Sequence, residues 1–285
     1  MKKRLPLLLV LVLGLAALLI SELRREDAEV SPRSLLNFLA DTQRESTRLP
    51  MRLTRLPDSE EISIGNNMAQ RYALPAQTYD DRATSDYLQR VGERLAVRAR
   101  RRLPYRFHFL PDPEMVNAFA LPGGHIFLGK GLFSLLDSED ELAAILGHEI
   151  AHVDRYHCAE RVQVEARARH LPLGGLATLP ITLFQAGYTK TQEFEADHEG
   201  VHWAVRAGYS PHAAVTVQKI FLKLRGDSEQ SIARTPQEEL SQLARQTLRD
   251  YFRSHPLPEE RIARLESLIR ANGWENQTRT TPLPR

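Results

Sequence analysis

Two histidines and a glutamate form the motif His148-Glu149-Ile150-Ala151-His152, and their spacing suits metal chemistry. Residues four apart lie one above the other on a helix, so both imidazoles can bind one ion. Glu149 directs its carboxylate beside the same ion, where it can take a proton from an attacking water. The motif therefore predicts a zinc-dependent hydrolase with Glu149 as the general base.

A buried helix is predicted to carry this motif. Ser138 followed by Glu141 predicts a capping box, and the acidic first turn suits the positive end of a helix dipole. Burying titratable groups is costly unless they are paired or bind metal. The metal site is therefore favoured over a solvent-exposed helix with salt bridges. The apolar residues of this segment are Leu142, Ile145, Leu146, Ile150 and Val153.

A catalytic zinc site needs a third protein ligand, and a second predicted helix from Thr189 to Gly208 offers several. Glu193 and Asp197 share a face of this helix, and Gly200 would let it pack closely. Glu193 can bind the metal while Asp197 orients a metal-binding imidazole. Spacing alone leaves three alternatives to Glu193, which are Glu195, His198 and His202.

A strand hairpin is predicted upstream of both helices. Tyr105 to Leu110 alternates as a strand does, and Val116 to Leu132 indicates two strands joined at Pro122 to Gly124. An edge strand can accept an extended peptide as an added strand, and an ordinary core hairpin is the alternative. The residues that such an edge would offer to a peptide are Ala118, Gly123, Gly124 and His125.

Composition narrows the class of partner. The chain has 285 residues, enough for one domain of roughly 200 residues with appendages. Its 38 Lys and Arg against 36 Asp and Glu leave a net charge of +2, which gives no electrostatic reason to expect nucleic acid. The lone cysteine, Cys158, excludes an internal disulfide and a cysteine-based zinc site.

The N-terminus is typical of an export signal. Three basic residues precede an uncharged run from Leu5 to Ile20, and such a flank sends the rest of the chain across the membrane. We therefore expect a periplasmic or other extracytoplasmic protein, with this segment either removed or kept as an anchor in the inner membrane. The uncharged stretch from Leu171 to Gly187 could be a lid, a membrane-touching loop or a core segment.

Six motifs in order resemble the HtpX-like and BepA-like metallopeptidases, which are related to the CAAX prenyl protease. They are EISIG (61–65), NAFALPGG (117–124), HEIAH (148–152), EFEAD (193–197), AGYSP (207–211) and SHPLPEERI (254–262). The resemblance implies that Glu193 is the third ligand and that Asp197 supports the site. It places Asn117 beside the substrate carbonyl. It also places His255 near the metal, where it either stabilises the transition state or caps the metal in a resting state.

These features predict an α+β, helix-dominated, gluzincin-type metallopeptidase domain with a small β-sheet and one zinc ion per chain. The resemblance is to short exported members without a helical-repeat domain. It implies an endopeptidase acting on unfolded or misassembled envelope polypeptides in protein quality control. The alternatives are a zinc-holding, chaperone-like binding protein and a hydrolase of non-peptide bonds. The predicted segments are a signal or anchor (1–22), a linker (23–60), the peptidase domain (61–272) and a tail (273–285).

Overall fold

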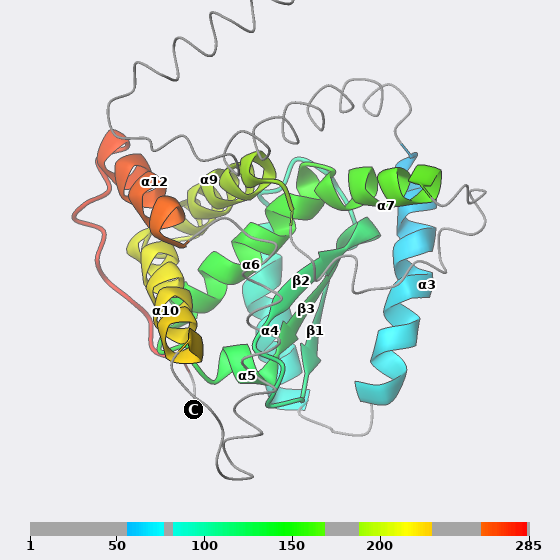
Figure 1. Cartoon of the computed structure of the whole chain (residues 1–285), viewed down its shortest axis with the longest axis horizontal. Coiled ribbons are helices and arrows are strands. Elements are labelled where there is room, and N and C mark those ends of the chain that lie inside the picture. Colours follow the sequence, from blue (N-terminus) through cyan, green and yellow to red (C-terminus); the bar gives the residue numbers. More distant parts are fainter. Residues whose placement is uncertain (1–55, 77–81, 169–187, 230–257, 284–285) are drawn as a thin grey trace, which may run out of the picture. The chain divides into compact units, whose positions relative to one another are not determined.

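The computed structural model describes residues 56–76, 82–168, 188–229 and 258–283. Helices dominate these ranges and pack beside one three-stranded sheet (Figure 1), which confirms the predicted α+β class. The predicted export segment, the stretch from Leu171 to Gly187 and His255 lie outside the described residues. Within the described ranges, no helix combines the length and the apolar character that crossing a bilayer requires.

Along the described ranges, two helices precede the three short strands and the other helices follow them. The helices are α3 (Asp58–Ala76), α4 (Arg82–Ala96), α5 (Lys130–Phe133), α6 (Glu139–Asp154), α7 (His157–Ala168), α9 (Lys190–Arg206), α10 (His212–Glu229) and α12 (Pro258–Ala271). The strands are β1 (Arg106–Leu110), β2 (Ala118–Leu121) and β3 (His125–Gly129), with a 3-10 turn, η1 (Pro122–Gly124), between β2 and β3.

The sheet has the order β1-β3-β2, with β1 parallel and β2 antiparallel to the central β3. The predicted hairpin is thus confirmed, and β2 lies at one edge of the sheet. Its turn depends on two glycines with positive φ, Gly123 at 75° and Gly124 at 99°. A Cβ at Gly123 would also lie 2.7 Å from the Cα of Ile62, so α3 packs directly on this turn.

Helix α6 lies at the centre of the described structure. It packs against α9, α4, α10 and strand β2, and each of its residues is buried. Figure 1 shows it running between α9 and the sheet. A helix that is buried all round contributes polar side chains directly to the interior, so any group that it carries must be satisfied there.

The helix caps follow the prediction with one correction. The Ser138 hydroxyl accepts the Glu141 N–H at 3.2 Å, as predicted. The Glu141 carboxylate accepts from the N–H of Asp137 at 2.8 Å, so the reciprocal half of the capping box is made one residue earlier. The start of α9 has both halves of a capping box, between Thr189 and Gln192. Both ligand-bearing helices therefore begin at well-defined residues.

Candidate metal centre

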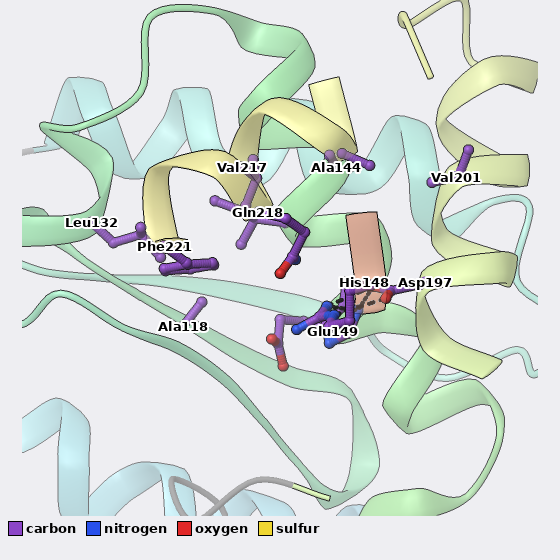
Figure 2. A pocket seen from close by; sticks show the side chains of 13 residues that line it. Ala118, Leu132, Ala144, His148, Glu149, Asp197, Val201, Val217, Gln218 and Phe221 are labelled. Carbon is purple, nitrogen blue, oxygen red and sulfur yellow. Dashed lines mark hydrogen bonds and ion pairs between the residues drawn. The ribbon is translucent and has the colours of Figure 1, made fainter. Parts of the chain in front are cut away.

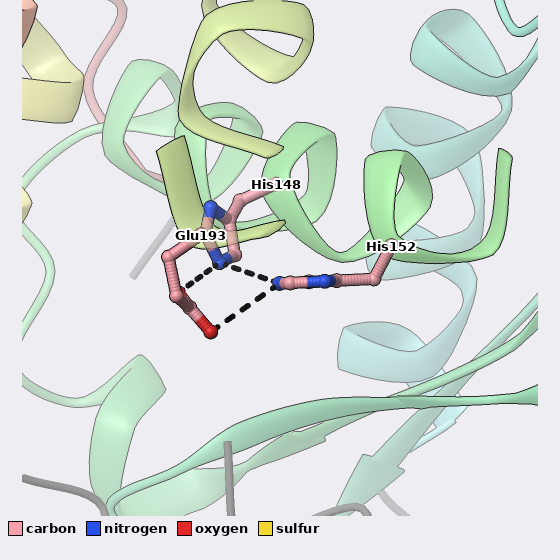
Figure 3. Close-up of side chains that lie close together, drawn as sticks. All are labelled: His148, His152 and Glu193. Carbon is pink, nitrogen blue, oxygen red and sulfur yellow. Dashed lines mark hydrogen bonds and ion pairs between the residues drawn. The ribbon is translucent and has the colours of Figure 1, made fainter. Parts of the chain in front are cut away.

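His148 and His152 of α6 and Glu193 of α9 converge on one buried point (Figure 3). One ligand atom from each lies within 4.8 Å of the other two. The two Nε2 atoms are 3.0 Å apart, and the Glu193 carboxylate is 3.3 Å from Nε2 of His148 and 3.8 Å from that of His152. Two imidazole nitrogens and one carboxylate form a donor set that zinc enzymes use, so these residues fit a bound divalent metal.

His148 is held by Asp197 from the same helix as Glu193. The Nδ1 atom of His148 lies 2.9 Å from Oδ1 of Asp197, as the shared face of α9 predicted. This bond leaves Nε2 of the neutral ring free to bind metal. Burial and the charge of Arg261 lower the pKa of His148, but hydrogen bonds to Asp197 and Glu193 outweigh them and raise it to about 9.

Arg261 of α12 completes the charge balance, and sequence reasoning missed it. Its guanidinium forms a bidentate salt bridge with Asp197, with Nε 2.8 Å from Oδ2 and Nη2 2.5 Å from Oδ1. Nη1 lies 3.5 Å from Oε2 of Glu193. Burial raises the pKa of Asp197, but the charge and hydrogen bonds of Arg261 have the larger, opposite effect. The pKa is therefore lowered overall, and Asp197 stays ionised. Arg261 lies inside the SHPLPEERI motif, which was the available signal.

A second support, from His157 to His152, was also missed. Nδ1 of His152 lies 3.0 Å from Nδ1 of His157, whose Nε2 lies 3.1 Å from the Glu195 carboxylate. The Tyr188 ring stacks on the imidazole of His152, with centroids 4.0 Å apart. A proton on Nδ1 of His152 and one on Nε2 of His157 satisfy this chain and leave Nε2 of His152 to face the metal position. The position of His157, five residues beyond His152, was the only sequence signal.

Glu149 is buried beside the ligands. It takes part neither in the contacts of Asp197 and Arg261 with His148 nor in those of His157 with His152. Burial is the largest influence on its carboxyl and raises the pKa to about 7, while His148 and the backbone N–H of Ala120 act in the opposite direction. The contact with Ala120 ties the carboxylate to the edge strand β2. A carboxylate with a pKa near neutrality suits proton transfer in both directions.

Asn117 lies just before β2 and is 3% exposed. Its backbone carbonyl accepts the Gly129 N–H at 3.0 Å. Alternate residues of an antiparallel strand face the partner strand, so the Ala118 and Ala120 peptide groups face the side of Glu149. Among the described residues, the side-chain oxygen of Asn117 is buried without a hydrogen-bond partner.

The other predicted peptide-binding residues lie in three different settings. Ala118 lines a cavity that also contacts Glu149. Gly123 and Gly124 form the turn, where the Gly123 N–H donates to Glu61 at 3.1 Å. His125 is 3% exposed, and its imidazole bonds to His108 and Asn66, at 2.9 Å each. Its side chain therefore joins the sheet to α3.

The rival ligands lie outside the cluster. Glu195 contacts His157, while the rings of His198 and His202 lie 4.5 Å apart and His202 packs on Trp274. In the described part of the chain, His148, His152 and Glu193 are the one group of three or more that could hold a metal. The structure thus brings together the ligand set that the motifs implied.

The chain is similar to known peptidases over most of its length. The profile of peptidase family M48 matches residues 82–269. The chain is 28% identical over 225 residues to the beta-barrel assembly-enhancing protease of Yersinia pestis, covering 72% of this chain and 43% of that protein. It is 29% identical to the protease of the same name from Escherichia coli strain K12, covering 72% of this chain and 42% of that protein. The chain thus spans less than half the length of these two relatives.

A mitochondrial relative matches over a larger share of its own length. The chain is 27% identical over 239 residues to the mitochondrial metalloendopeptidase OMA1 of Schizosaccharomyces pombe, covering 78% of this chain and 66% of that protein. The residues of the metal centre and of its supports, from His148 to Arg261, all fall inside the matched family range.

Proposed function

Because this chain belongs to peptidase family M48, we propose that it is a zinc-dependent endopeptidase that hydrolyses peptide bonds with Glu149 as general base. One observation carries the proposal: His148, His152 and Glu193 converge on one buried point, with the Glu149 carboxylate beside it. A bound zinc ion would polarise the substrate carbonyl and make water more acidic.

The chain's own residues supply the proton transfers. Glu149 takes the proton of the attacking water and delivers it to the departing amine, for which its raised pKa is suited. Asp197 and His157 hold the two imidazoles in the tautomers that direct a lone pair of Nε2 toward the metal position. Arg261 keeps Asp197 ionised and close to His148.

Asn117 and the edge strand would position an extended polypeptide. A peptide added beside β2 would meet the outward-facing backbone groups of Ala118, close to Glu149. The amide of Asn117 can then contact the peptide group that is cleaved, which would give its buried oxygen a partner. His255 remains a proposed second contributor, either stabilising the developing oxyanion or capping the metal at rest.

We propose unfolded or misassembled envelope polypeptides as substrates. The names of the two bacterial relatives connect those proteins with β-barrel assembly. The basic and apolar pattern of residues 1–22 supports an extracytoplasmic location with contact to the membrane through that segment.

The decisive experiment compares the wild-type protein with Glu149→Gln. We expect the variant to bind one zinc ion per chain, measured by elemental analysis, and to lose cleavage of unfolded casein by at least about 100-fold. A chelator should stop the wild-type protein, and added zinc should restore it. Full cleavage by Glu149→Gln would overturn the mechanism.

The chaperone-like alternative makes a different prediction. A protein that only holds polypeptides would bind unfolded casein equally with and without Glu149 and would release no fragments from it. A buried carboxylate tied to the edge strand has no evident use in binding alone, which favours the peptidase.

A further inference from the structure

A cavity of about 30 Å³ opens directly beside His148 and Glu149 (Figure 2). Its polar lining consists of His148, Glu149, Asp197, Gln218 and Arg261. Its apolar lining includes Leu132, Ile145, Val201, Val217 and Phe221, which come from α5, α6, α9 and α10. All charged groups among the described lining residues belong to the metal centre.

We propose that this cavity receives the substrate side chain on the amine side of the scissile bond, and that it selects a small aliphatic residue there. The inference rests on the proposed peptidase function and defines which peptide bonds that site would cut.

The position of Glu149 decides which side of the bond enters the cavity. A general base that takes a proton from water must pass it to the nitrogen that leaves, so that nitrogen lies next to Glu149. The residue that bears this nitrogen has its side chain beside the same carboxylate. The cavity is lined by His148 and Glu149, whereas His152 and Glu193 are absent from its lining.

The edge strand would bring a peptide to the same cavity. Ala118 is both the first residue of β2 and part of the cavity wall. A peptide running beside β2 therefore passes the mouth of the cavity, and side chains of an extended peptide alternate in direction. One side chain next to the cleaved bond can then point into the cavity while its neighbours point away.

The size and chemistry of the cavity decide which residue fits. A volume of 30 Å³ is room for about two water molecules, enough for a few methyl groups but not for an aromatic ring. Val217 and Phe221 form part of the far wall and are 5% and 4% exposed. The charged groups of the lining, Glu149, Asp197 and Arg261, belong to the metal centre. A charged side chain would lose its hydration there and could pair only by competing with the contacts that this centre needs. Alanine and valine therefore fit, and lysine, aspartate and phenylalanine do not.

The first test maps the cuts. The zinc-loaded full chain would digest a set of unfolded proteins, and mass spectrometry would identify the residue after each cut. We expect cuts before Ala or Val to exceed cuts before Phe or Lys by about tenfold or more, after correction for abundance. Equal cutting before Lys or Phe would overturn the proposal.

A matched pair of variants tests the cavity itself. Val217→Ala enlarges the cavity, whereas Val215→Ala removes the same methyl groups from a residue of α10 that is also 5% exposed but packs with Leu265 and Ile269. We expect cuts before Leu or Phe to rise about tenfold relative to cuts before Val in Val217→Ala only. An unchanged ratio in Val217→Ala, or the same change in both variants, would contradict the inference.

A binding measurement separates this inference from the proposed function. Zinc-loaded Glu149→Gln would be titrated with fluorescent peptides that differ at one position, carrying Ala, Val, Phe or Lys. If the wild-type protein cuts nothing, the peptidase proposal fails, and the affinities still judge the cavity. The cavity inference is supported if the Ala and Val peptides bind more tightly than the Phe and Lys peptides, and if Val217→Ala increases the affinity for the Phe peptide. Equal affinities for all four peptides reject it.

Discussion

Gly147 of α6 and Gly200 of α9 meet backbone to backbone, and this contact brings the ligand-bearing helices together. A Cβ at Gly147 would lie 2.9 Å from the carbonyl oxygen of Gly200, and one at Gly200 would lie 2.7 Å from the backbone nitrogen of His148. The contact lies next to a ligand in sequence, so the separation of the helices sets the distance from His148 to Glu193.

Gly200→Val should therefore loosen the metal centre as well as the fold. We expect a loss of about 1–3 kcal/mol in the free energy of unfolding from overpacking. Zinc affinity should fall as well, because α9 must move away from α6. Urea denaturation and zinc titration would measure the two effects. A destabilised variant with unchanged zinc affinity would show that the distance between the helices does not control the site.

Arg261→Ala should destabilise the metal-free protein by about 3–5 kcal/mol, because it leaves the buried carboxylate of Asp197 without its bidentate partner. Arg270→Ala, on the exposed side of the same helix, is the control and should cost less than about 1 kcal/mol. The double variant Arg261→Ala/Asp197→Ala should lose less than the sum of the single variants. Additive losses would show that the pair is not coupled.

His157→Phe should weaken zinc binding about 10- to 100-fold, because Nδ1 of His152 loses the group that fixes its tautomer. Competition with a chromophoric chelator would measure the dissociation constant. His198→Phe, a histidine of α9 outside the cluster, should leave the zinc affinity unchanged. Equal effects of the two substitutions would argue against a specific role for His157.

The pair of half-buried His108 and buried His125 should make the fold sensitive to acid. Burial, with the positive charge of Arg106, lowers the pKa of His108 from 6.5 to about 4, and burial with His108 and Arg106 lowers that of His125 to about 4. Between pH 4 and 6.5 the unfolded chain binds more protons than the folded chain, so stability falls as the pH drops through this window.

The His108→Gln variant tests this sensitivity. It keeps a hydrogen-bonding group beside His125 and removes one titrating site. We expect the urea midpoint of the variant to change less than that of the wild-type protein between pH 6.5 and pH 4. A parallel decline in both proteins would assign the acid sensitivity to other groups.

Local chemistry explains what could be predicted from the sequence. The hydroxyl of Ser138, the turn glycines Gly123 and Gly124, and the spacing from His148 to His152 act over a few residues, so their patterns specify structure directly. Glu193 and Asp197 share a helix face for the same local reason, because they are four residues apart.

Other contacts could not be predicted because they cross between elements. Arg261 reaches Asp197 across 64 positions in the chain. Glu149 meets the backbone of Ala120 through the packing of α6 on β2. These contacts depend on how the elements pack. The error in the capping box at α6 is local instead: the Glu141 carboxylate accepts the N–H of Asp137, one residue before Ser138, at 2.8 Å.

The position of Arg261 near the C-terminal end of the described residues also determines the order in which the parts of the site are synthesised. A ribosome makes both histidines and Glu193 before it makes α12, so a nascent chain carries the ligands before the guanidinium that neutralises Asp197 exists. The metal centre reaches its final charge balance only when α12 docks on α9. A chain that ends before α12 therefore carries all three ligands and Asp197 but lacks the guanidinium that pairs with Asp197.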